Sequence, residues 1–180
     1  MRSRATRHLA LAVGLVGAGV FAASPALAGA DHARAGGPWT TYSAEVPTGA
    51  TGKVTAVYDA AGKTVIMLHV KGLKPFTEYG AHAHVNPCGV TGAAAGPHWQ
   101  HVPDPITPSV NPVYANPRNE IWLDLTTDED GNGVAQSKQD WQFAPGQAPR
   151  SVVLHAQHTS TAPGTAGTAG ARLGCLSVDF

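Results

Sequence analysis

The 180-residue sequence has no excess of basic charge, because its 12 Lys and Arg residues are balanced by 12 Asp and Glu residues. Three of the arginines, Arg2, Arg4 and Arg7, lie at the extreme N-terminus, and without them the net charge is near −3. A nucleic-acid-binding domain is typically basic on at least one face. The composition therefore gives no support to a nucleic-acid partner.

Long hydrophobic runs are also lacking, apart from one at the N-terminus. Residues 9–22 are apolar and uncharged; they follow the three arginines and precede Ala26-Leu27-Ala28, a small-residue cleavage pattern. These features predict a secretory signal peptide over residues 1–28. A transmembrane anchor is the alternative, but the run is shorter than the roughly 20 residues that a span needs. We expect a secreted, extracytoplasmic protein that has no membrane contact after cleavage.

Cysteine is scarce, since the chain contains only Cys88 and Cys175. In an exported chain two cysteines favour a disulfide, and two unpaired buried thiols are the alternative. A disulfide that closes so long a loop stabilises the fold by roughly 4–5 kcal/mol in the chain-entropy description.

Sustained helical periodicity is absent, and short apolar or alternating runs recur between Gly and Pro residues. We predict strands over residues 53–58, 64–70, 79–84, 119–127, 134–143, 151–155 and 176–180. Many short strands with turn residues between them indicate an antiparallel sandwich or barrel. We assign residues 49–180 to this domain and residues 29–48, which begin small and polar, to a flexible leader.

Two long segments without periodicity interrupt the predicted strands. Residues 87–118 contain seven prolines, and residues 156–171 are rich in Thr, Ala and Gly. Segments of this length in a compact domain are usually functional or disordered. Both lie between the histidines described next, so we expect functional loops, with surface loops of no role as the alternative.

Four histidines and one arginine form the pattern that carries the most chemistry. His82 and His84 are two residues apart, so on a strand both rings leave the same face. His98, His155 and Arg172 follow them in the chain. Imidazole nitrogens suit copper and zinc. Copper together with an arginine indicates a small anionic redox substrate.

Several short motifs, in order from Lys53 to the C-terminus, resemble the copper-zinc superoxide dismutase family. The matching pieces are Gly80-Ala81-His82-Ala83-His84, Cys88, Gly96-Pro97-His98, Asp128-Glu129-Asp130-Gly131, Ser151-Val152-Val153-Leu154-His155 and Gly167-Thr168-Ala169-Gly170-Ala171-Arg172-Leu173-Gly174-Cys175. Each piece alone is weak, and the ordered set is specific. The resemblance implies an all-β Greek-key sandwich, a flattened barrel with two long functional loops, and a Cys88–Cys175 disulfide.

The same resemblance implies the roles of the site residues. His82, His84 and His155 would hold copper permanently, and His98 would be the ring that bridges copper and zinc in the relatives. His98 would also pass a proton to the second superoxide as a general acid. Arg172 would attract and orient the superoxide anion.

The zinc half of the relatives' site looks absent from this sequence. Arg118 stands near the place of a zinc histidine, Ile121 near that of an aspartate, and Thr159 where the relatives carry an aspartate that links the two metal sites. We therefore expect a copper-only member of the family, without zinc. A carboxylate would then orient His98, as carboxylates do for metal-bound imidazoles; Glu120 is the first candidate and Asp124 the second.

Two further alternatives stay open. His101, with Asp104 or Asp124, could form a replacement zinc site. The function that we expect is an exported superoxide dismutase that converts superoxide to O₂ and hydrogen peroxide by Cu(II)/Cu(I) cycling. The alternative is a non-catalytic copper-binding protein for storage or delivery. The sequence does not distinguish a monomer from an oligomer.

Overall fold

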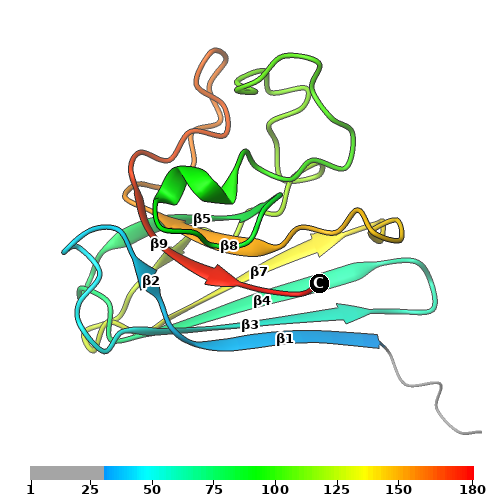
Figure 1. Cartoon of the computed structure of the whole chain (residues 1–180). Coiled ribbons are helices and arrows are strands. Elements are labelled where there is room, and N and C mark those ends of the chain that lie inside the picture. Colours follow the sequence, from blue (N-terminus) through cyan, green and yellow to red (C-terminus); the bar gives the residue numbers. More distant parts are fainter. Residues whose placement is uncertain (1–30) are drawn as a thin grey trace, which may run out of the picture.

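Two antiparallel β-sheets pack face to face in the computed structural model, which describes residues 31–180 (Figure 1). The predicted signal peptide lies outside these residues. One sheet has the strand order β1-β3-β4-β7 and the other β2-β9-β8-β5-β6. The strands are β1 Asp31–Pro38, β2 Thr40–Thr41, β3 Thr51–Tyr58, β4 Thr64–Lys71, β5 Glu78–His84, β6 Leu125–Thr126, β7 Gly133–Gln139, β8 Ser151–His155 and β9 Arg172–Ser177. The predicted antiparallel β-sandwich is confirmed, and its Greek-key connectivity stays a prediction.

Alternation of apolar and polar residues sets the inner face of the four-stranded sheet. In β3 and β4, Val54, Ile66 and Leu68 are fully buried, while Lys53 and Lys71 on the opposite face are exposed. The strands predicted over residues 53–58 and 64–70 form an antiparallel hairpin, and eight residue pairs join them. Its turn is held by Asp59, whose Oδ1 accepts the N–H groups of Ala61 and Lys63.

The five-stranded sheet is the element that positions the histidines. β8 lies between β5 and β9, and His155 lies opposite Gly80 of β5. Because side chains alternate along a strand, His155 leaves the same face as His82 and His84. The intervening Ala81 and Leu154 face the other sheet and belong to the core. The three rings therefore lie on the outer face of this sheet.

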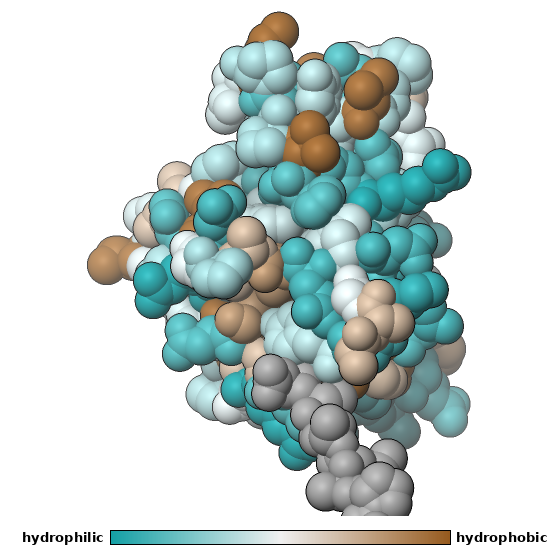
Figure 2. All heavy atoms as spheres, turned by 90° about the vertical axis from the view of Figure 1, so that its right-hand side faces the viewer, coloured by the Kyte–Doolittle hydropathy of each residue, from teal (hydrophilic) through white to brown (hydrophobic). Residues whose placement is uncertain are grey.

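The two long loops cover that outer face, and Figure 1 shows them standing above it. The first contains the short 3₁₀ helix η1, Gly92–Ala95. Several large apolar residues of this loop, among them Val102, Ile106 and Val113, are exposed. Figure 2 shows brown hydrophobic side chains near the top of the molecule, separated by more hydrophilic surface. Singly scattered apolar residues of this kind are normal for a protein surface.

The strand predicted over residues 119–127 is regular only at β6. Ile121, Leu123 and Leu125 are buried, as the alternation predicts. The backbone of Ala83, however, divides its hydrogen bonds: its N–H donates to the Ile121 carbonyl, and its carbonyl accepts from the Trp99 N–H. Two segments thus share one edge of β5, so neither forms a continuous ladder there.

The prediction of a flexible leader over residues 29–48 is wrong for the residues that the structure describes. β1 pairs with β3 over eight residues, and β2 pairs with β9. Trp39, between them, is buried in the core, and Gly52 makes room for it, because a Cβ there would lie 2.6 Å from the indole. Main-chain pairing to a sheet edge supplies this order, and composition does not reveal it.

The end of the chain also differs from the expected strand. β9 begins at Arg172 rather than near residue 176, because the short run Arg172–Ser177 pairs along β8. No helix within residues 31–180 has the length and apolar character needed to cross a membrane.

The predicted disulfide is confirmed, since the sulfur atoms of Cys88 and Cys175 are 2.02 Å apart. The bond joins the loop after β5 to the middle of β9 across 87 residues of sequence. Cys175 packs with Ala95 of η1 and Val153 of β8 in a small second hydrophobic cluster. The disulfide therefore anchors the η1 loop over the histidine face.

Replacing both cysteines, as Cys88→Ala with Cys175→Ala, should lower the free energy of unfolding by about 2–5 kcal/mol, because the unfolded chain regains the entropy of a long open loop. Urea denaturation of the oxidised protein and of the double variant measures the difference. Reductant should destabilise only the wild type. Equal unfolding midpoints for the two proteins would contradict the assignment.

Candidate metal centre

Four histidine rings converge on the outer face of the five-stranded sheet. His82 and His84 come from β5, and His155 is the last residue of β8. His98 comes from the long loop, and its backbone bridges to that of His84. One nitrogen of each ring lies within 4.8 Å of the corresponding nitrogen of every other. His82 and His84 are fully buried, and His155 is 4% exposed.

Main-chain carbonyls fix the tautomers of two of these rings. Nδ1 of His84 lies 2.9 Å from the Gly96 carbonyl oxygen, and Nδ1 of His155 lies 3.4 Å from that of Gly170. A carbonyl oxygen only accepts, so each Nδ1 carries the proton and each Nε2 of the neutral ring is bare. The two Nε2 atoms are 3.4 Å apart. Two lone pairs facing each other at this distance call for a cation between them.

A carboxylate fixes His82 through a threonine. Oγ1 of Thr159 lies 2.7 Å from Asp124 Oδ1 and 2.7 Å from His82 Nε2. The hydroxyl proton goes to the carboxylate, which only accepts, so the hydroxyl oxygen accepts the Nε2 proton of His82. The remaining nitrogen, Nδ1, is buried and has no hydrogen-bond partner among the residues described. A buried bare nitrogen without a donor requires an explanation, and a bound metal ion supplies one.

The fourth ring is fixed by Glu120, whose side chain is 1% exposed. Its Oε2 accepts from His98 Nδ1 at 2.9 Å and from Trp122 Nε1 at 2.7 Å, while Oε1 accepts from Gln100 Nε2 at 2.7 Å. The carboxylate thus receives three donors and holds the His98 proton on Nδ1. In the neutral form of the ring, His98 therefore also presents a bare Nε2.

Burial keeps the three strand-borne rings, those of His82, His84 and His155, neutral. Desolvation, with a smaller contribution from the neighbouring His98, lowers the pKa of His84 to about 2 and that of His155 to about 3. The same causes lower the pKa of His82 well below its ordinary value. These three rings consequently offer lone pairs at neutral pH.

A transition metal fits this donor set. Four neutral imidazole nitrogens, with no carboxylate or thiolate among them, suit copper, zinc, nickel or iron. One bound cation would give the unpartnered Nδ1 of His82 a partner and would remove the repulsion between the Nε2 atoms of His84 and His155. The arrangement supports a metal centre, and the choice of metal is a proposal taken up below.

Arg172 lies at the mouth of the centre, opposite His155 in the ladder between β8 and β9. Its Nη1 donates to the Gly92 carbonyl and its Nη2 to the Gly96 carbonyl, both at 2.7 Å. Burial lowers its pKa below the ordinary arginine value, yet a guanidinium stays charged in proteins. The Gly96 carbonyl accepts from both Arg172 and His84, so one loop carbonyl connects the guanidinium to a histidine of the metal centre.

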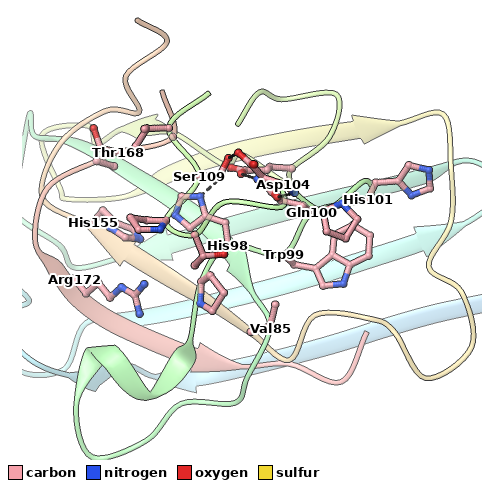
Figure 3. A pocket seen from close by; sticks show the side chains of 18 of the residues that line it. Val85, His98, Trp99, Gln100, His101, Asp104, Ser109, His155, Thr168 and Arg172 are labelled. Atoms are coloured by element: carbon pink, nitrogen blue, oxygen red, sulfur yellow. Dashed lines mark hydrogen bonds and ion pairs between the residues drawn. The ribbon is translucent and has the colours of Figure 1, made fainter. Parts of the chain in front are cut away.

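A pocket of about 710 Å³ opens beside these groups. His98, His155 and Arg172 belong to its lining, and Trp99, His101 and Asp104 extend the lining away from His155 and Arg172. Figure 3 shows the Arg172 guanidinium projecting into the pocket below His155. A small anion can therefore reach the histidine nitrogens and the guanidinium together.

The structure brings together most of the residues that the sequence singled out. The four histidines converge, Cys88 bonds Cys175, and Glu120 contacts His98. Asp124, the second candidate for His98, is instead bonded to Thr159, with its Oδ1 4.0 Å from Nε2 of His82.

The replacement zinc site on His101 is not formed. The His101 ring stacks on Trp141 with centroids 4.7 Å apart, and Asp104 accepts from Ser109 and from the Ile106 N–H. Within residues 31–180, the four-histidine cluster is the only group of three or more His, Cys, Asp or Glu residues placed to hold a metal.

Three contributors were missed by sequence reasoning. The sequence indicates Thr159 only as the place of a lost aspartate, and its hydroxyl in fact links Asp124 to His82. Gln100 and Trp122 complete the shell of donors around Glu120. No local motif marks Thr159 or Gln100, because their contacts join segments at least 20 residues apart in the sequence, whereas Trp122 lies only two residues from Glu120.

Comparison with known proteins adds evidence for the fold. No protein-family model matches the chain, and no curated protein matches its sequence. Among solved structures, the chain is similar to a Cu/Zn superoxide dismutase from Brucella abortus, with a TM-score of 0.51 and 20% sequence identity. The similarity covers 71% of this chain and 88% of that chain. It shows a shared β-sandwich fold, and the residues of the site carry the argument for function.

Removing the hydroxyl of Thr159 should weaken metal binding. In Thr159→Val the His82 Nε2–H faces a methyl group, and losing such an orienting partner typically costs about 10–100-fold in metal affinity. Thr159→Ser keeps the hydroxyl and should stay near wild type. Competition titrations of Cu(II) and Zn(II) against a chelator measure both. Wild-type affinity in the valine variant would show that the relay does not support the ligand.

Proposed function

We propose that this chain is an exported, copper-dependent superoxide dismutase. The observation that carries the proposal is the convergence of four imidazole rings, two of which, His98 and His155, line a pocket together with Arg172. The structural similarity to a superoxide dismutase supports it. The disulfide, a bond that persists in oxidising compartments, supports export.

Copper bound to the four histidines would supply reversible one-electron chemistry, so that two superoxide anions and two protons yield O₂ and hydrogen peroxide. The chain's own residues bring the anion to that position. Arg172 is held by two carbonyls, and its remaining N–H groups, which have no acceptor among residues 31–180, would bind a negative oxygen. A fixed cation in a half-buried pocket attracts and orients a small anion more strongly than a mobile lysine would.

His98 is the residue best placed to handle a proton. It alone among the four comes from a loop, and Glu120 holds the proton on its Nδ1. A second proton on this ring would therefore be held at Nε2, the atom through which the neutral ring would bind copper. The buried Glu120 carboxylate would offset the positive charge of that state. Proton donation from Nε2 would then serve formation of peroxide.

The copper-only character of the centre is part of this proposal. The Nδ1 atom of His98, which a bridging histidine would give to a second metal, is occupied by Glu120. No other metal-binding cluster is present in the part of the chain that the structure describes. Glu120 thus takes over the orienting role that we expected of a carboxylate.

Loading with both copper and zinc should leave about one copper per chain and negligible zinc, because one donor set is present and its fourth ring is already oriented. Elemental analysis after desalting measures both metals. The His98→Ala variant should lose copper affinity. A tightly held zinc ion that disappears in His101→Ala would contradict the copper-only proposal.

Arg172→Ala should keep full copper occupancy and lose tenfold or more in kcat/KM. A charge about 5 Å from the anion contributes roughly 3 kcal/mol at an effective dielectric of about 20, before solvent screening reduces it. Arg172→Lys should fall between the two, since the charge stays but the planar fork is lost. Pulse-radiolysis or stopped-flow decay of superoxide, at several ionic strengths, measures the rates.

Arg150→Ala is the matched control, because it removes one exposed positive charge that does not line the pocket. Its rate should stay near wild type. If Arg172→Ala matches wild type at low salt, the steering role is wrong. If the copper-loaded wild type dismutes superoxide no faster than free copper, the alternative of a copper storage or delivery protein replaces the enzyme.

A further inference from the structure

The outer face of the four-stranded sheet, which points away from the sandwich core, collects positive charge. Arg34 of β1, Lys53 of β3, Lys71 of β4 and Lys138 of β7 all share this face and are exposed. No position of the face is Asp or Glu; the others are Gly, Pro, Thr, Val, Met, Gln and His. Figure 1 shows this sheet as the lower layer, so the face lies on the opposite side of the molecule from the metal centre.

This accumulation runs against the overall charge of the chain. Beyond residue 30 the sequence has nine Lys and Arg residues and twelve acidic ones, yet four of the nine cations and none of the acids occupy this face. Lys63, Lys74 and Arg150 elsewhere form ion pairs with Asp140, Glu45 and Asp179. Among the side chains that the structure describes, the four cations of the face have no such partner. A face of one sign without counter-charges attracts anions.

The face is also hollowed. A depression of about 710 Å³ is lined by Arg34, Lys53, His69 and Lys71 among others. Its shape follows from the register: Lys53 lies opposite His69 on one side and opposite Gly36, which has no side chain, on the other. The neighbouring Gly37 has open space where a Cβ would stand. The missing side chains leave room for a ligand between the cationic groups.

We propose that this face binds a linear anionic polysaccharide, one that carries sulfate or carboxylate groups along its length. Arg34, Lys53 and Lys71 lie on three adjacent strands about 4.8 Å apart, and each is displaced by two residues, about 6.6 Å, from the next, so they form a diagonal row of charges. Thr51, Thr55 and Gln136 place hydroxyl and amide groups among them for sugar hydroxyls. The disulfide is consistent with an oxidising compartment outside the cytosol, where such polymers occur.

The chemistry of the face argues against other polyanions. It carries no Phe, Tyr or Trp side chain to serve as the stacking platform that binding of single-stranded nucleic acid uses. Its one exposed large apolar residue is Val134, and membrane-surface binding needs an apolar face as well as cations. Because the metal centre lies on the other sheet, a bound polysaccharide would leave the pocket open. The inference is therefore independent of the proposed enzyme function.

Binding of the full chain to heparin and to polygalacturonate, with neutral dextran as the negative control, tests the proposal by titration calorimetry. The binding constant should fall with salt with a logarithmic slope of about −3, since each neutralised charge on a flexible polyanion contributes roughly −0.7. The triple variant Arg34→Gln, Lys53→Gln and Lys71→Gln should bind at least tenfold more weakly, with a slope near −1.

The matched control is Lys63→Gln, Lys74→Gln and Arg150→Gln, which changes the net charge equally but leaves the face intact. It should bind within twofold of wild type, and circular dichroism should show both variants folded. Equal loss in both variants would mean that net charge, not this face, binds the polymer. Tighter binding to duplex DNA or to phosphatidylserine vesicles than to either polysaccharide would overturn the choice of ligand.

Discussion

Four bare ring nitrogens held within a few ångströms of one another are the constraint on which the rest of this structure depends. Without a cation their lone pairs repel, as the 3.4 Å separation of the His84 and His155 Nε2 atoms illustrates. The arrangement persists because the other nitrogen of every ring is tied: to Gly96, Gly170, Thr159 or Glu120. Burial adds to this by lowering the pKa values of the strand-borne rings, which keeps the lone pairs free.

The segments between β5 and β6 and between β8 and β9 supply these hydrogen-bond partners of the rings. The η1 loop brings the Gly96 carbonyl to both His84 and Arg172, and the Cys88–Cys175 disulfide anchors that loop to β9. Glycine allows the close approach: a Cβ on Gly92 would lie 2.9 Å from the Arg172 side chain. The second loop passes so near β5 that a Cβ on Gly80 would lie 2.4 Å from the Gln157 carbonyl oxygen, and this proximity sets Thr159 on His82.

What could be predicted from sequence follows from the range of each interaction. The two-residue period places His82 and His84 on one face, and Glu120 could be named because a carboxylate near His98 was required. Thr159 could not, since its role appears only when residue 159 reaches Asp124 across another loop. The strand β1 was missed for the same reason: its small residues are ordered by pairing to β3, an interaction that lies outside any local pattern.

The two outer faces of the sandwich differ in charge: the four-stranded sheet exposes several cations, and the pocket over the five-stranded sheet contains a single arginine. Sheets pack about 10 Å apart, and the Debye length at physiological salt is about 8 Å, so cations on the four-stranded face are largely screened from the pocket on the other side. Among the residues that line the pocket in the described part of the chain, Arg172 is the only Lys or Arg, and it shares the lining with Asp104 and Glu120. An anion that enters the pocket is thus attracted by one fixed guanidinium beside the histidines, and the position of that guanidinium depends on the carbonyls of Gly92 and Gly96.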